Sequence, residues 1–171
     1  SALPGVRRVS TRAVSELTRR HEGLRTVFGT EADEPRQRLL DPVGLIEETV
    51  DLADLDEDAR AASLRDLERA AARHPFDLES DRPLRARLVR LGANRHRALL
   101  ASPHIVVDNA SIQVIVADLA ALYAGECAGA PHPRPPRLRY VDYVRWDRER
   151  LTGDALAEAE GYWTEELRGA V

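Results

Sequence analysis

A histidine and an aspartate four residues apart are the groups in this sequence best placed to do chemistry. They lie in the segment L-L-A-S-P-H-I-V-V-D-N-A-S, residues 99–111, where an apolar run ends at His104 and Asp108 precedes a helical pattern. A histidine at a strand end can present one ring nitrogen to a cavity while a backbone group holds the other. The spacing also fits a capping aspartate beside a structural histidine, the more common arrangement, so residue types alone leave both interpretations open.

The remaining histidines and the one cysteine form no second reactive pattern. His21, His74, His96 and His132 are scattered and lack metal-ligand spacing, which predicts that the protein holds no metal. His132 lies in a proline-rich segment with no partner near it in the sequence. Cys127 lies among small residues, without a neighbouring base to activate it as a nucleophile.

Composition narrows the class of protein. The 171 residues are 43% hydrophobic and 32% charged, which is typical of one compact globular domain. The net charge of -4 argues against nucleic acid as a partner. The apolar stretch over residues 112–116 is too short to span a membrane, and a single cysteine fits a reducing cytoplasm. Because the chain contains no methionine, we expect it to be processed or excised from a longer protein.

Hydrophobic periodicity predicts a mixed α+β layer built around a hairpin whose turn is residues 92–95. The segment 131–136 holds four prolines and predicts a stiff, extended connection. An amphipathic helix over 111–123 should follow the His104 segment, and Ser10 or Thr11 should cap the first helix. The other expected elements are helices over 12–21, 57–72, 140–150 and 155–167, and strands over 24–28, 36–40, 45–50, 83–91 and 97–101.

Five segments, in order along the chain, resemble the motifs of condensation domains from nonribosomal peptide synthetases. The most specific is R-H-E-G-L-R-T-V-F over residues 20–28, which is similar to the family's R-H-E-x-L-R-T-x-F at every fixed position. The spacing between the segments is also family-like, and together they cover the chain from about Val9 to Leu167. The other four are H-P-F-D-L over 74–78, R-A-R-L-V-R-L-G over 85–92, Y-V-D-Y-V-R-W over 140–146, and Y-W followed by E-L over 162–167.

The resemblance implies a fold and partners. It implies an α+β, two-layer α/β sandwich of the chloramphenicol-acetyltransferase-like group, with a mixed sheet and flanking helices. Residues 1–171 would form the N-terminal subdomain, without the family's opening segment and without the C-terminal subdomain that completes the active-site tunnel. The implied partners are that C-terminal subdomain and peptidyl or aminoacyl carrier proteins, whose phosphopantetheine arms carry the substrates. No bound cofactor, nucleic acid or membrane is implied.

The family motif H-H-x-x-x-D-G also implies roles for site residues. Its second histidine, the active-site residue, is His104. Its aspartate is Asp108, which in the family pairs with an arginine, for which Arg85 is the candidate by position. Backbone N–H groups of Asn109, Ala110 and Ser111 are candidates to stabilise an oxyanion or line the channel. The sequence departs from the motif twice, with Pro103 in place of the first histidine and Asn109 in place of the glycine.

Three functional interpretations follow from the resemblance. The first is an amide-forming acyltransferase of antibiotic or siderophore biosynthesis, expected to be inactive as this isolated half because His104 would face water. The second is a non-catalytic condensation-like module that recruits a carrier protein or tailoring enzyme, as Pro103 and Asn109 suggest. The third is a piece excised from a larger active enzyme.

Overall fold

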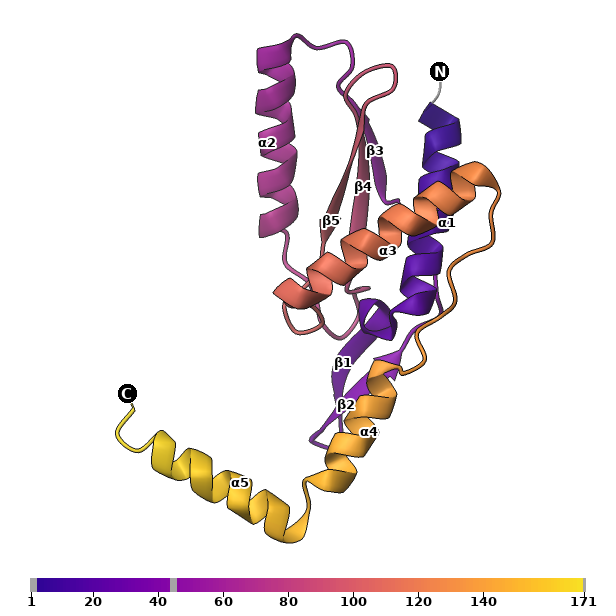
Figure 1. The fold of residues 1–171 in the computed structure, drawn as a ribbon. Coiled ribbons are helices and arrows are strands. Elements are labelled where there is room, and N and C mark those ends of the chain that lie inside the picture. The colour runs from indigo at the N-terminus through magenta and orange to yellow at the C-terminus, as the bar shows by residue number, and fades with distance from the viewer. Residues whose placement is uncertain (1–2, 44–45, 171) are drawn as a thin grey trace. The chain divides into compact units, whose positions relative to one another are not determined.

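The computed structural model describes residues 3–43 and 46–170, which divide into two units, Ser1–Pro135 and Pro136–Val171. The second unit consists of helices α4 (Tyr140–Arg150) and α5 (Gly153–Glu166). The described residues of the first unit form three α-helices, a 3-10 helix and five strands (Figure 1). In chain order these are α1 (Leu3–Arg20), η1 (Glu22–Arg25), β1 (Thr26–Glu31), β2 (Glu34–Leu39), β3 (Glu48–Asp51), α2 (Glu57–Arg73), β4 (Arg85–Arg90), β5 (His96–Ala101) and α3 (Asn109–Ala128).

A mixed three-stranded sheet lies at the centre of the first unit. Its order is β3-β4-β5, with β3 parallel to β4 through the α2 crossover and β4 antiparallel to β5. Alternation along β4 directs Ala86 and Leu88 toward Val14 of α1, while Arg85 and Arg87 face the end of α2. Helices therefore flank both faces of the sheet (Figure 1), and the mixed sheet with flanking helices is confirmed.

The core beside the sheet forms where α1 meets α3. Ala13 and Leu17 of α1 pack with Leu24 of η1 and Leu122 of α3, and all four are buried. The prediction of an amphipathic helix in this part of the chain is wrong in one respect, because the apolar residues of α3 are spread around the helix and are not confined to one face. A large part of its apolar surface, residues 112, 114 and 116 included, is exposed. Helices that are apolar all round are usually buried all round.

By length and composition alone, α3 could cross a membrane, since the mean hydropathy of an 18-residue window reaches 1.3. The apolar stretch noted in the sequence is short, but the helix that contains it spans residues 109–128. The middle of α3 nevertheless carries Asp118, which forms an ion pair with Arg20 of α1. That ion pair ties α3 into the rest of the first unit.

Several element boundaries differ from the predictions. Helix α1 begins at Leu3, so Ser10 and Thr11 lie inside it and do not cap it; Pro4 is tolerated because the first helical turn needs no N–H donors. The start of the strand predicted over 24–28 belongs to η1. The strand predicted over 45–50 is found at Glu48–Asp51, and its first predicted residue, Leu45, lies outside the described residues.

The second unit presents a row of aromatic rings. Tyr140, Tyr143 and Trp146 follow helical spacing on α4, with successive ring centroids 5.9 and 5.8 Å apart. Trp146, like Trp163 of α5, is exposed. Among the residues that the structure describes, neither tryptophan is therefore buried in a core.

Candidate functional site

The turn between β5 and α3 carries the predicted catalytic histidine. Ser102 follows the end of β5, and its hydroxyl donates a 2.6 Å hydrogen bond to the carbonyl of Pro83. The next residues turn sharply, and the Val106 N–H donates to the Pro103 carbonyl at 3.1 Å. His104 lies in this turn with its side chain exposed. The fold thus presents His104 on a short, hydrogen-bonded loop.

Asp108 caps the helix that follows. Its Oδ1 accepts hydrogen bonds from the Ser111 N–H at 2.7 Å and from the Ser111 hydroxyl at 2.6 Å. These two bonds hold the pKa of Asp108 below its usual value, and the bond from the Ser111 hydroxyl has the larger effect. The nearby His104 lowers this pKa by a smaller amount. The capping role predicted from the sequence is confirmed. Asp108 therefore fixes where α3 begins, two residues after the turn.

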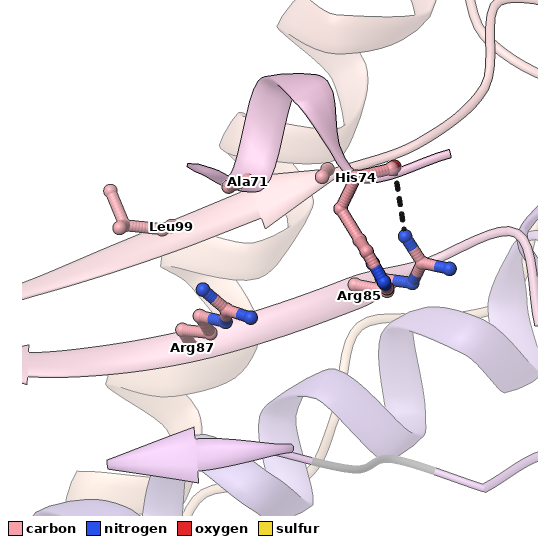
Figure 2. A pocket seen from close by; sticks show the side chains of 6 residues that line it. Ala71, His74, Arg85, Arg87 and Leu99 are labelled. Carbon is pink, nitrogen blue, oxygen red and sulfur yellow. Dashed lines mark hydrogen bonds between the residues drawn. The ribbon is translucent and has the colours of Figure 1, made fainter. Parts of the chain in front are cut away.

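Arg85 does not pair with Asp108. It donates to the Asp81 carboxylate at 2.8 Å and to the carbonyls of His74 and Pro75 at 3.0 and 2.8 Å. Figure 2 shows the bond to the His74 carbonyl. The predicted pair is absent because strand alternation points Arg85 toward α2, whereas α3 packs on the other face of the sheet. Arg85 instead supports the chain that follows α2.

The first turn of α3 supplies backbone N–H groups beside His104. The N–H of Ser111 is taken up by Asp108, so this residue is not an available oxyanion donor. For Asn109 and Ala110, the hydrogen bonds of the described residues include none from their N–H groups. Asn109 has a negative φ, since Ala32 and Asp33 are the non-glycine residues with positive φ in the described part of the chain. The backbone at this position therefore does not require the conformational freedom of glycine.

An open, mainly apolar groove of about 850 Å³ adjoins the turn. It is bounded by the C-terminal half of α2, by β5 and by the first half of α3. Pro103 and Val107, on either side of the exposed turn residues, line the groove together with Ile112 and Val116 of α3. A smaller pocket on the α2 side of the sheet (Figure 2) contains Arg85 and Arg87.

The R-H-E segment, residues 20–22, lies next to α3 and the His104 turn. Arg20 Nε and His21 Nε2 lie 2.6 and 2.7 Å from the same Asp118 oxygen on α3. A Cβ on Gly23 would lie 3.6 Å from the Val106 carbonyl oxygen, so η1 lies directly against the His104 turn. His21 therefore has a structural role, since its ring contacts Asp118 of α3.

Sequence reasoning missed Asp118, although an acidic residue within an apolar helix was a usable signal. Burial by itself would raise the pKa of Asp118. The hydrogen bonds and charges of Arg20 and His21 have the larger combined effect, so the pKa of Asp118 lies below its usual value. In the described part of the chain, no three His, Cys, Asp or Glu side chains lie close enough together to hold a metal ion.

The family profile of the Condensation domain matches residues 7–171. The chain belongs to the condensation domain family. The resemblance seen in the sequence is thereby confirmed, and the motif positions His104, Asp108 and Asn109 can be compared with the family's histidine, aspartate and glycine.

Relatives of known sequence and structure agree with this membership. The chain is 41% identical over 161 residues to chondramide synthase cmdD of Chondromyces crocatus. The aligned region covers 94% of this chain and 4% of that protein. The X-domain solved in complex with OxyB from teicoplanin biosynthesis is 28% identical, with a TM-score of 0.77 over 96% of this chain and 36% of the solved chain. The starter condensation domain of rhizomide synthetase RzmA superposes with a TM-score of 0.83, and at 19% identity it supports the fold alone.

The chain spans a small part of these relatives. It corresponds to 39% of the RzmA starter condensation domain chain and to a few per cent of the curated synthetase. The condensation fold that it shares is therefore established, while the activity and partners of a complete protein remain to be proposed.

Proposed function

We propose that this chain supplies the His104-bearing part of a condensation domain that joins an acyl donor to an amine acceptor in nonribosomal peptide biosynthesis. One observation carries the proposal: the motif histidine is exposed on the turn between β5 and α3, beside free N–H groups at the start of a helix. Both substrates would be thioesters on the phosphopantetheine arms of carrier proteins. The peptidyl or aminoacyl carrier proteins and the C-terminal condensation subdomain are the proposed partners.

The chemistry is acyl transfer. The acceptor nitrogen attacks the donor carbonyl, the new C–N bond forms as a tetrahedral intermediate, and the C–S bond then breaks to release the pantetheine thiol. His104 would accept the proton that the amine loses, or hold the amine in line for attack. The N–H groups of Asn109 and Ala110, at the positive end of the α3 dipole, would stabilise the oxyanion. Asp108 would act through the geometry of the helix start.

The exposure of His104 supports a second part of the proposal, that this half is inactive by itself. A general base of this kind works best where water is excluded and both substrates are held in position. The apolar groove and the exposed apolar side of α3 offer surface for the C-terminal subdomain. Condensation product above the buffer rate from the purified 171-residue chain and loaded carrier proteins would contradict this expectation.

The direct test is a condensation assay with the complete domain and two loaded carrier proteins. His104→Ala should lower the rate of product formation by about 10² to 10⁴, the usual contribution of a positioned acid–base group. His96→Ala is the matched control, because this histidine lies at the hairpin end of β5 and does not line the groove. Equal rates for His104→Ala and the unmodified domain would refute the proposal.

A second candidate function is recruitment without catalysis. It is favoured by Pro103 and Asn109, since proline removes both the side chain and the backbone donor of the motif's first histidine. The similar X-domain is known in complex with OxyB, which makes partner binding a reasonable alternative for a condensation-like fold. A recruitment module should bind its partner with unchanged affinity after His104→Ala and should yield no condensation product in either form.

A further inference from the structure

The N-terminal part of α1 carries a group of arginines with little compensating negative charge. We call Arg7, Arg8 and Arg12 the arginine patch, and all three residues are exposed. Arg12 lies 3.6 Å from Glu126 of α3. Among the described residues, neither Arg7 nor Arg8 has a hydrogen bond or an ion pair. The acidic residue of α1, Glu16, pairs with an arginine farther along the helix.

Helix α2 shows a different balance of charge. Helix α1 holds five arginines and one acidic residue, whereas α2 holds four arginines and four acidic residues. In the arginine patch, Arg8 and Arg12 are four positions apart, so two like charges are neighbours on one side of the helix, which is unfavourable. The whole chain carries a net charge of -4. The patch is therefore a local concentration of positive charge on an acidic protein, and a bound anionic group would stabilise it.

The arginine patch borders an open pocket of about 650 Å³ between α1 and β3. Pro4 and the buried Ile46 give part of its lining an apolar character. Thr49 of β3 also lines it, and the hydroxyl of this residue has no hydrogen-bond partner within the described part of the chain. The described residues that line the pocket include no aspartate or glutamate. The pocket thus offers positive charge beside apolar surface, without a competing carboxylate on its walls.

We propose that the arginine patch and its pocket bind an acidic segment of a partner polypeptide. Guanidinium groups match the geometry of carboxylates, and three exposed arginines on one helix can meet several carboxylates along a chain. An open pocket suits a polypeptide that continues beyond it, whereas small-molecule sites usually enclose most of their ligand. The surface is separate from the groove beside His104, because β3 and β5 are opposite edges of the sheet. The inference therefore does not depend on condensation activity.

Fluorescence anisotropy with the complete 171-residue chain tests this inference. The probe is a short fluorescein-labelled peptide of alternating glutamate and alanine, at an ionic strength of about 0.15 M, where charges more than about 8 Å apart are largely screened. We expect saturable binding of this peptide and none of the same peptide with glutamine in place of glutamate. Joint substitution of Arg7→Gln, Arg8→Gln and Arg12→Gln should weaken binding about tenfold, because three modest ion pairs are lost together.

The matched control removes the same charge from α2. Arg65, Arg69 and Arg73 are exposed on this helix, which lies on the opposite face of the sheet from α1. Their joint replacement by glutamine should change the affinity less than about twofold. Circular dichroism of both triple variants establishes that they are folded.

Three results would overturn the inference. The first is the absence of saturable binding by the glutamate peptide. The second is an equal loss of affinity in the two triple variants, which would show that net charge alone attracts the peptide. The third is saturable binding of inorganic pyrophosphate, measured by calorimetry, by a chain that does not bind the peptide, which would make the arginine patch a phosphate site instead.

Discussion

The two ends of α3 are held in different ways. At its N-terminal end, His104 and the first helical residues are exposed, and the capping contacts there join Asp108 to Ser111 within the same helical turn. Farther along, Asp118 pairs with Arg20 of α1, and Glu126 pairs with His132, which follows α3 in the chain. A reacting group has to remain accessible to its substrate, whereas the helix behind it has to stay in place. The charged network is therefore found where α3 is anchored, away from the motif histidine.

The largest expected effect compares apolar side chains from the two ends of α3. Leu122 is 1% exposed and Ile112 is 45% exposed. Leu122→Ala should lower the free energy of unfolding of the 171-residue chain by about 3 kcal/mol, because it leaves a cavity between α1 and α3. Ile112→Ala should cost less than about 1 kcal/mol. Urea unfolding measures both, and equal costs would remove the distinction between the two ends.

The next effect concerns the anchor itself. Asp118→Ala should destabilise the chain by about 2 kcal/mol, because it leaves Arg20 and His21 partly buried without their shared acceptor. Asp66→Ala is the control, since that carboxylate pairs with Arg69 at the surface and should contribute less than about 0.5 kcal/mol. If both substitutions shift the urea midpoint equally, the anchor is no stronger than a surface pair.

A smaller effect is expected at the open end. Asp108→Ala removes the cap of α3 and should lower the melting temperature by a few degrees, whereas Asp108→Asn retains a capping oxygen and should lower it less. In a complete condensation domain, the rate should fall in the same order if helix position is what Asp108 contributes. A rate loss equal for both variants would instead assign importance to the charge of Asp108.

The smallest expected effect is a loss of folding stability at acidic pH. The pKa of Asp118 is lower in the folded chain than in the unfolded chain, so its stabilising contribution is present above the unfolded pKa. That contribution is lost as the pH falls through the folded value. The urea midpoint should therefore decrease between about pH 5 and about pH 3, and it should decrease less in Asp118→Asn. An identical acid dependence in the variant would show that other carboxylates account for it.

Local patterns in the sequence predicted much of this molecule. Helix α4 was predicted at its observed bounds, and α2 was predicted to within one residue, because acidic residues at the start and a His-Pro at the end mark it locally. The hairpin of β4 and β5 followed from alternation and a Gly-Ala-Asn-Arg turn. The candidate histidine and the capping aspartate were also identified from residue types, and the cap is confirmed.

Contacts between distant residues were not predictable in the same way. Arg85 was assigned to Asp108 by position, but whether two charged groups meet depends on which face of a strand each occupies. His132 lacked a partner near in the sequence, although two carboxylates surround it, one of them 116 positions earlier in the chain (132 − 16). Such pairs arise only when α1 and α3 pack together.

The sequence by itself determined the family, the elements and the position of His104, because motifs and periodicities are local properties of the chain. The tertiary structure decided which charges pair, which apolar surfaces of α3 remain exposed, and that the R-H-E segment lies behind the His104 turn. These depend on packing, since the free energy of a buried contact is set by neighbours that the chain brings together only on folding.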